Sequence, residues 1–178
     1  RTLVFARRQR NVTAIVAVPV DDACVAQHLA EAVRCPTVPL DDRGTPDPEA
    51  FERLHRMLEE TYPLVHRILE REVVSGYSLL YTWRGTQSEL ESVMVMAHQD
   101  VVSADPASLD QWTHPPFAGH VTNDFIWGRG TLDIKNQLIG IMEAAETLLS
   151  RGYQPERTIL FGMGHDEETG GVNGCKVM

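Results

Sequence analysis

The chain contains 178 residues, and 16 basic against 25 acidic side chains give it a formal net charge of −9. Hydrophobic residues make up 43% of the sequence and charged residues 23%, a composition typical of one folded domain and too apolar for a disordered chain. The acidic balance argues against nucleic acid as a partner, and no apolar run approaches the roughly 18 residues of a membrane-spanning helix.

The N-terminal segment carries the only basic cluster, formed by Arg1, Arg7, Arg8 and Arg10. We interpret residues 1–21 as a tail that precedes a domain over 22–178. Such a cluster is typical of a solvated tail and also of the flank of a removed signal or membrane anchor. The three cysteines form neither a CxxC pair nor a disulfide framework, so the sequence leaves the compartment undetermined: Cys24, Cys35 and Cys175.

Two helices are predicted in the first third of the chain. Residues 22–34 place apolar side chains at helical spacing after a pair of aspartates that could cap the helix. Residues 35–48 are rich in Pro, Asp and Gly and predict a loop. Residues 48–60 repeat the helical pattern, and Pro63 is expected to end that helix.

The pattern then changes to strands, with β-rich runs at 64–74, 77–84 and 92–97 that are expected to be antiparallel. A strand at 125–128, a helix at 134–150 and a strand at 157–164 follow. We interpret this last series as a βαβ unit, which would make part of the sheet parallel. The predicted fold class is therefore α/β with a mixed sheet. Met94 and Met96 are interpreted as core residues of their strand.

Polar residues stand near the ends of three predicted strands. His98 and Asp100 follow one strand, Asp133 lies beyond another, and Glu167 and Glu168 end the acidic run after the third. In an open α/β sheet, ligands bind beyond the carboxyl ends of the strands. The question that these residues raise is whether they form one site.

Each cluster alone has a structural explanation: a His-Asp pair that closes a turn, an N-cap at Asp133, and a solvated acidic face. Together, one imidazole and two carboxylates make a ligand set for a zinc-like ion, and another carboxylate could act as general base. Asp100 could accept a hydrogen bond from His98 and leave its second ring nitrogen free for the metal. Only Arg129 and Lys135 supply nearby positive charge within these motifs, so a divalent cation would neutralise the excess.

Four blocks in this order resemble the M20 metallopeptidases, and within them the carboxypeptidase S and N-acyl-amino-acid hydrolase branch: HQDVV (98–102), WTHPPFAGH (112–120), WGRGTLDIKN (127–136) and GHDEETGG (164–171). The resemblance implies a zinc-exopeptidase-like α/β/α sandwich, truncated before the lid domain. It implies a zinc-dependent hydrolase of peptide or N-acyl-amino-acid amide bonds, with two zinc ions per complete site. The substrate would be a peptide or an N-acyl amino acid.

The resemblance also implies a role for each site residue. His98 would bind one zinc, Asp133 would bridge two zincs and be followed by a cis peptide, and Glu168 would bind the other zinc. Glu167 would be the general base, and Asp100 would orient His98. The loop that contains Trp112, Pro116 and Phe117 would pack near the site.

The chain departs from the family pattern in two ways. Ser103 and Ile134 replace residues that are usual in this branch, and neither change removes an expected ligand. The family's two further ligands, an acid and a late histidine, are expected beyond Met178. We therefore expect this segment to be part of a longer protein and to turn over substrate poorly by itself. Export or membrane anchoring through an upstream segment remains open, as does the oligomeric state.

Other functions find less support in the sequence. No GxSxG motif indicates a serine hydrolase, and no GxGxxG or GxxxxGK[ST] motif indicates nucleotide binding. A non-catalytic module that keeps the fold is the alternative interpretation. The remaining histidines are interpreted as structural at His28, His55 and His66, while His114 and His120 flank the PPF loop and could approach the site.

Overall fold

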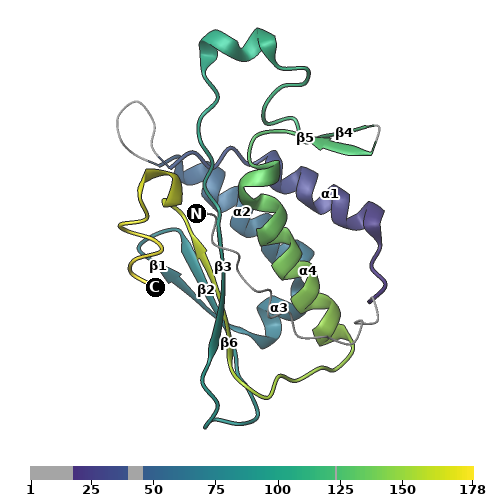
Figure 1. Cartoon of the computed structure of the whole chain (residues 1–178), viewed down its shortest axis with the longest axis vertical. Coiled ribbons are helices and arrows are strands. Elements are labelled where there is room, and N and C mark those ends of the chain that lie inside the picture. Colours follow the sequence, from purple (N-terminus) through teal and green to yellow (C-terminus); the bar gives the residue numbers. More distant parts are fainter. Residues whose placement is uncertain (1–17, 40–45, 123) are drawn as a thin grey trace, which may run out of the picture.

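The structure is a computed structural model that describes residues 18–39, 46–122 and 124–178 (Figure 1). The N-terminal basic cluster and part of the predicted loop over 35–48 lie outside the described residues. Within the described ranges, no helix is long and apolar enough to cross a bilayer.

Capping explains where the first two helices begin. Helix α1 (Asp22–Val33) follows Asp21, whose carboxylate accepts hydrogen bonds from two backbone N–H groups of the first turn. Helix α2 (Pro48–Thr61) follows Asp47, which caps it in the same way, and begins with a proline, a residue suited to the first helical position. Both helices confirm the sequence-based prediction.

The prediction for the next segment was partly wrong. Helix α2 ends at Thr61, before Pro63, as expected. Pro63 then begins a further short helix, α3 (Pro63–Ile68). The expected strand over 64–74 is therefore confined to β1 (Glu70–Val74). A short apolar run fits a helix as well as a strand, and here the proline at the first helical position favours the helix.

One mixed sheet of four strands forms the centre of the molecule, in the order β1-β2-β6-β3. Strand β2 (Ser78–Trp83) pairs antiparallel with both β1 and β6 (Ile159–Gly164), whereas β3 (Val93–His98) pairs parallel with β6. The fold class, α/β with a mixed sheet, is confirmed. Strand β3 does not join the antiparallel set, contrary to the prediction.

The parallel pair arises differently from the βαβ unit that the sequence suggested. Helix α4 (Asn136–Ser150) lies in the connection between β3 and β6. The predicted strand at 125–128 is instead β5 (Phe125–Trp127), which pairs antiparallel with β4 (His120–Thr122) in a separate small sheet. Three-residue strands give too little pattern to reveal their partners.

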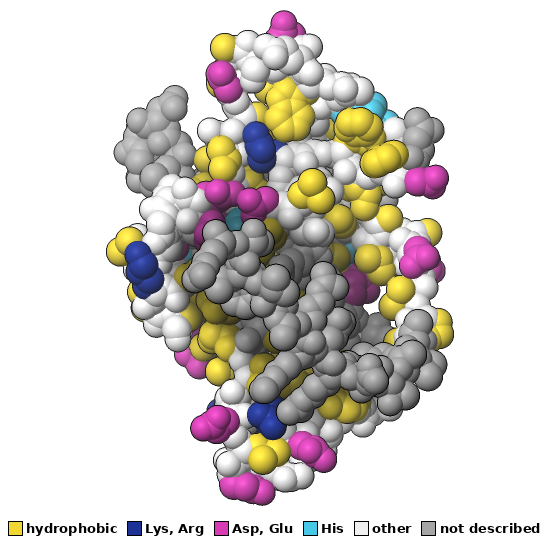
Figure 2. Space-filling model, in the orientation of Figure 1, with side chains coloured by type: hydrophobic (Ala, Val, Ile, Leu, Met, Phe, Trp, Pro, Cys, Tyr) yellow, Lys and Arg dark blue, Asp and Glu magenta, His cyan; other side chains and the backbone are white. Residues whose placement is uncertain are grey.

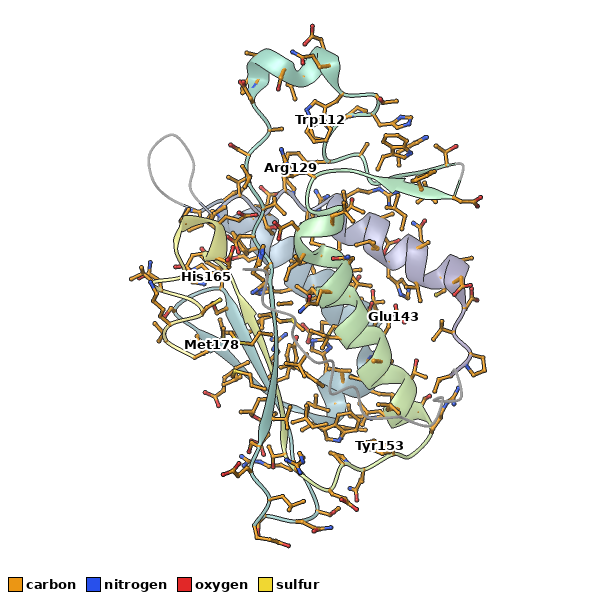
Figure 3. All side chains as sticks on the ribbon, in the orientation of Figure 1. Trp112, Arg129, Glu143, Tyr153, His165 and Met178 are labelled. Carbon is orange, nitrogen blue, oxygen red and sulfur yellow. The ribbon has the colours of Figure 1, made fainter. Side chains whose placement is uncertain are left out.

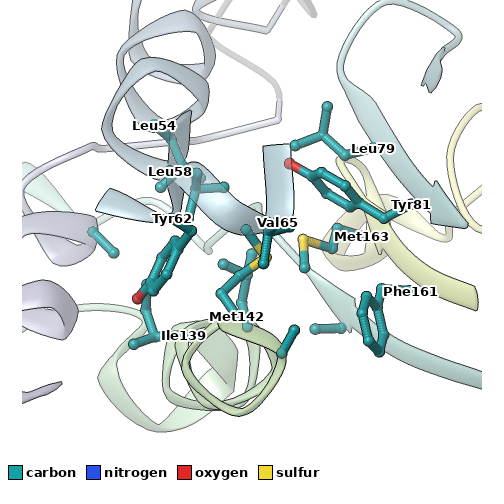
Figure 4. Close-up of a cluster of buried hydrophobic side chains, with 14 of the residues drawn as sticks. Leu54, Leu58, Tyr62, Val65, Leu79, Tyr81, Ile139, Met142, Phe161 and Met163 are labelled. Atoms are coloured by element: carbon teal, nitrogen blue, oxygen red, sulfur yellow. The ribbon is translucent and has the colours of Figure 1, made fainter. Parts of the chain in front are cut away.

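The core lies on one face of the mixed sheet, where α1, α2, α3 and α4 pack (Figures 1 and 4). Tyr81, Phe161 and Met163 point from the strands toward these helices, and Met142 of α4 fills the space between them. No described helix covers the opposite face, so the described residues form two layers of the expected α/β/α sandwich. On that face Met94 is 37% and Met96 is 41% exposed, so their prediction as core residues was wrong.

Candidate metal centre

Three segments meet at the carboxyl ends of β3 and β6. His98 is the last residue of β3, Asp133 lies in the turn Thr131–Lys135 before α4, and Glu168 lies in the short turn Glu167–Thr169 after β6. One potential ligand atom from each of His98, Asp133 and Glu168 lies within 4.8 Å of the other two. Because β3 and β6 are parallel neighbours, their ends share one edge of the sheet, as the sequence argument required.

The ring of His98 is buried and its two nitrogens face different groups. Nε2 lies 3.2 Å from Oδ1 of Asp133 and 3.6 Å from Oε2 of Glu167. Nδ1 lies 3.0 Å from the backbone carbonyl oxygen of Asp100 and 3.4 Å from its carboxylate oxygen Oδ1. The shorter of the two contacts between Asp100 and the His98 ring is therefore made by the main chain of Asp100.

The buried carboxylate of Asp100 connects the two strand ends. Its Oδ2 accepts a hydrogen bond of 2.9 Å from the backbone N–H of Glu168, while its Oδ1 is buried without a hydrogen-bond partner. Oδ1 faces the His98 ring instead. The hydrogen bond between Oδ2 and the Glu168 N–H fixes the start of the turn that carries both glutamates.

Acidic side chains shape the electrostatics of this cluster. Burial by itself lowers the pKa of His98, but the nearby carboxylate and the backbone carbonyl of Asp100, with the charge of Glu167, raise it to about 9. Burial raises the pKa of Glu168, and the charge of Asp133 adds to this effect. A site that favours protonated groups in this way also favours a bound cation, and one imidazole with carboxylates is a donor set that suits a divalent metal.

Glycines shape the turn that carries Asp133. Gly130 has a φ of +82°, and a Cβ there would lie 2.4 Å from a methyl group of Val101. The peptide bond after Asp133 is cis, as the resemblance implied. Asp133 is not the N-cap of α4, since that position belongs to Lys135. The side chain of Asp133 is 73% exposed to solvent.

The two cations of these motifs differ in position. Lys135 is fully buried, and its Nζ donates hydrogen bonds to the carbonyl oxygens of Ala32 and Cys35 at the end of α1. Burial lowers its pKa to about 7. Lys135 thus fastens α1 to the Asp133 turn and does not neutralise the acids. Arg129 instead lines a cavity beside them.

That cavity has a volume of about 780 Å³ and adjoins the acidic cluster through Asp133 and Glu168. Much of the rest of its wall is apolar or aromatic: Leu29, Val102, Trp112, Phe125, Ile126, Trp127 and Leu132. Figure 2 shows acidic side chains gathered around a histidine, with a basic side chain directly above them. A cavity with an apolar wall next to a polar cluster is typical of a small-molecule site.

The other histidines lie outside this cluster. His28 contacts Glu143, His55 contacts Gln99, and His66 contacts the main chain and a tyrosine hydroxyl, which agrees with the structural roles predicted for them. His114 and His120 stack on each other at 4.1 Å between ring centroids and do not join the group of His98, Asp133 and Glu168.

Gln99 is a positioning residue that the sequence analysis missed. It is fully buried beside His98, and its Nε2 donates to the carbonyl oxygens of Tyr77 and Met163, each at 2.8 Å. Its Oε1 lies 2.7 Å from Nε2 of His55. Gln99 lies between a candidate ligand and the residue expected to orient it, and it gave no separate signal, because its role depends on neighbours that are distant in the sequence.

Comparison with known proteins adds independent information. Residues 94–178 match the family described as Peptidase family M20/M25/M40. Carboxypeptidase S of Saccharomyces cerevisiae is 44% identical over 156 residues, which is 84% of this chain and 27% of that protein. The N-fatty-acyl-amino acid synthase/hydrolase PM20D1 of Xenopus tropicalis is 38% identical over 154 residues, 85% of this chain and 29% of that protein. The chain thus spans less than a third of the length of these relatives.

Solved structures agree on the fold. Human carnosine dipeptidase 1 matches with a TM-score of 0.66 at 20% identity, over 84% of this chain and 33% of that structure. An M20 family metallo-carboxypeptidase from Sulfolobus solfataricus also matches with a TM-score of 0.66, at 22% identity, over 86% of this chain and 33% of that structure. Both comparisons support the α/β fold with its mixed sheet.

Proposed function

We propose that this chain, which belongs to the M20 peptidase family, supplies part of the active site of a metal-dependent hydrolase. The bonds that we propose for cleavage are amide bonds of peptides or of N-acyl amino acids. Relatives named as a carboxypeptidase and as an N-fatty-acyl-amino acid hydrolase support this choice of substrates. The convergence of His98, Asp133 and Glu168 is the observation on which the proposal depends.

We further propose zinc as the metal, with two ions in a complete site, which His98, Asp133 and Glu168 would help to hold. Zinc accepts imidazole and carboxylate ligands together, and a catalytic site keeps one position open for water or substrate. Asp100 supports this assignment because it holds Nδ1 of His98 and so directs Nε2 toward the acids.

In the proposed reaction, Glu167 is the general base. When bound, the metal acts as a Lewis acid that polarises the substrate carbonyl and makes water easier to deprotonate. Glu167 takes a proton from the attacking water and then delivers it to the leaving amine. Its side chain is 53% exposed and faces the same point as Nε2 of His98, so it can reach a water there. The hydrogen bond from the Glu168 N–H to Asp100 holds the turn in place.

The proposal is tested with Glu167→Gln in the full-length protein. We expect hydrolysis to fall by about 10²–10⁴-fold, because the amide cannot accept the proton, while the metal content stays nearly unchanged. Metal analysis and a hydrolysis assay measure the two quantities. Glu156→Gln, at an exposed glutamate after α4, is the matched control and should retain full activity.

Two results would contradict these assignments. Full activity of Glu167→Gln would reject Glu167 as the base. An unchanged metal stoichiometry in His98→Ala or Asp133→Ala would remove that residue as a ligand. A full-length protein that binds no metal and hydrolyses neither substrate class would instead favour a non-catalytic module.

A further inference from the structure

A second group of interacting side chains joins α1, α2 and α4, apart from the residues of the candidate metal centre. Cys24 and His28 stand four residues apart on α1, and Sγ of Cys24 lies 3.4 Å from Nε2 of His28. The other ring nitrogen, Nδ1, lies 2.5 Å from Oε1 of Glu143, which Figure 3 shows between α4 and α1. The hydroxyl group of Tyr62, at the end of α2, donates a hydrogen bond of 2.9 Å to the same carboxylate oxygen.

The partners of Glu143 fix the direction of these hydrogen bonds. An ionised carboxylate only accepts, so it accepts from the Tyr62 hydroxyl and from the Nδ1–H group of His28. Burial, with the charge of Glu143, raises the pKa of Tyr62, so this hydroxyl stays a donor at neutral pH. In the neutral imidazole, Nε2 then has a free lone pair and accepts from the Cys24 thiol. This is the order of a nucleophile, its base and the acid that orients the base.

Cys24 is open to reagents, whereas its base is held in place. Cys24 is exposed and unoxidised, while His28 is partly buried and packs edge-on against the Tyr62 ring at 5.7 Å between ring centroids. The other two cysteines differ: Cys35 is buried, and burial raises the pKa of the Cys175 thiol. Within the ranges that the structure describes, Cys24 alone combines exposure with a histidine at hydrogen-bonding distance.

The surroundings of Cys24 select the charge of a reagent. Asp21 caps α1 and Asp22 lies in its first turn, while the sequence of α1 contains no lysine or arginine. Glu143 adds a further acid on the far side of His28. Because like charges repel, a reagent with carboxylates approaches the sulfur less readily than an uncharged one of similar size.

We propose that Cys24 is a nucleophilic thiol that reacts with small uncharged disulfides, with His28 as its base. Sγ attacks one sulfur of the disulfide while Nε2 takes the thiol proton, and the disulfide bond breaks. The leaving sulfur takes that proton from Nε2 and departs as a thiol. Cys24 is thereby oxidised to a mixed disulfide, and the released half of the reagent is reduced. Glu143 stabilises the imidazolium that forms during the step. The modification site does not depend on the proposed hydrolase function.

The test measures mixed-disulfide formation in the native full-length protein at neutral pH, by mass spectrometry of the peptide that contains Cys24. The reagent is bis(hydroxyethyl) disulfide, which is uncharged. In His28→Gln we expect the rate at Cys24 to fall about tenfold or more, because a thiol without a base is only a few per cent ionised at this pH. The rate at Cys175 should change less than about twofold, since it has no contact with His28. His120→Gln, the same change at an exposed histidine of β4, is the matched control and should leave both rates unchanged.

An unchanged rate at Cys24 in His28→Gln, or an equal fall at Cys175, would overturn the proposal and leave the cluster a structural contact between helices. Where His28→Gln does not fold, Glu143→Gln decides by the same comparison. That variant loses the charge that stabilises the imidazolium, so the rate at Cys24 should fall about threefold or more.

The class of reagent is tested with dithiodiglycolate, a small disulfide that carries two carboxylates. Each rate at Cys24 is divided by the rate of the same reagent with N-acetylcysteine amide, an uncharged thiol, to remove the intrinsic difference between the reagents. This ratio should be about threefold or more lower for dithiodiglycolate than for bis(hydroxyethyl) disulfide. Equal ratios would overturn the assignment of uncharged disulfides as the preferred reagents.

Discussion

Gln99, which is buried, and His55, which is partly buried, show how single side chains set the position of the candidate metal centre. Gln99 connects the start of β2, the end of β6 and helix α2 through its amide, and its main chain also bonds to Gly164 and Thr37. An unmade hydrogen bond of a buried group costs about 1–3 kcal/mol. Such a network therefore fixes the place of the residues on either side of Gln99.

The protonation state of His55 should make the stability of this network depend on pH. Burial lowers the pKa of His55 below its usual 6.5, so the folded protein binds fewer protons there than the unfolded chain. The contribution of His55 to stability is thus complete above about pH 6.5 and is lost as the pH falls below that value. We expect His55→Gln, which can still donate to Gln99, to lose less stability between pH 7 and pH 5 than the unchanged protein. Urea denaturation at several pH values measures this difference, and parallel curves for the two proteins would refute it.

The identity of the candidate ligands was readable from the sequence, whereas the supporting contacts were not. His98, Asp133 and Glu168 stand near the ends of predicted strands, where a carboxylate or an imidazole attracts notice. The place of Arg129 in the cavity wall and the buried amide of Gln99 depend on residues that approach only in the folded chain. Their side chains are of common types, so the sequence alone did not distinguish them.

At the scale of elements, the turn between β5 and α4 is the most constrained part of the site. It carries Asp133 between Gly130, with its positive φ, and Lys135, whose amine is held by the end of α1. The turn therefore depends on both the glycine and the packing of α1. The helix predicted over 134–150 is present as α4, which begins at Asn136 and buries Ile139 and Met142.

Gly130→Ala should disturb this turn and weaken metal binding. The new Cβ would lie 2.4 Å from Val101, and the positive φ adds strain of about 1 kcal/mol or more. Gly152→Ala is the matched control, because Gly152 has a φ of +72° but no neighbouring atom within 4 Å of the new Cβ. Both variants should be less stable, and only Gly130→Ala should bind metal more weakly by calorimetry. Equal metal affinities would show that the turn tolerates the change.

Helices with caps and strong periodicity were predicted well, and short elements were not. Helices α1 and α2 have aspartate caps and apolar faces that are visible in the sequence. The six residues of α3 and the three residues of β5 are too few to show a period, so tertiary packing decides their structure.

On the scale of the whole molecule, the sheet has one edge that no described strand pairs and one face that no described helix covers. Strand β3 is the last strand of the sheet order, and its Val93, Met94 and Met96 are exposed. The side chain of Gln137 donates to the carbonyl oxygen of Met96 and so occupies one hydrogen-bonding position of this edge. An exposed edge with apolar side chains favours association between chains.

Met96→Lys should therefore reduce self-association of the 178-residue chain. Lysine places a charge beside the edge of β3 that no described strand pairs, which opposes pairing between two sheets. We expect sedimentation velocity to show a smaller fraction of dimers and larger species in Met96→Lys than in the unchanged chain. Leu90→Lys, a partly exposed position in the turn before β3, controls for the added charge. The same distribution of species in all three proteins would show that the edge does not drive association.

Asp100 joins the ends of two parallel strands through one carboxylate and one carbonyl group. The imidazole and the glutamate pair are thereby coupled mechanically, without any route through the hydrophobic interior. A shift of the Glu167–Thr169 segment, such as a ligand could impose, reaches the imidazole directly. In natural relatives, replacements at His98 and in the Glu167–Thr169 segment should consequently occur together, because Asp100 can link the two only when both contacts are present.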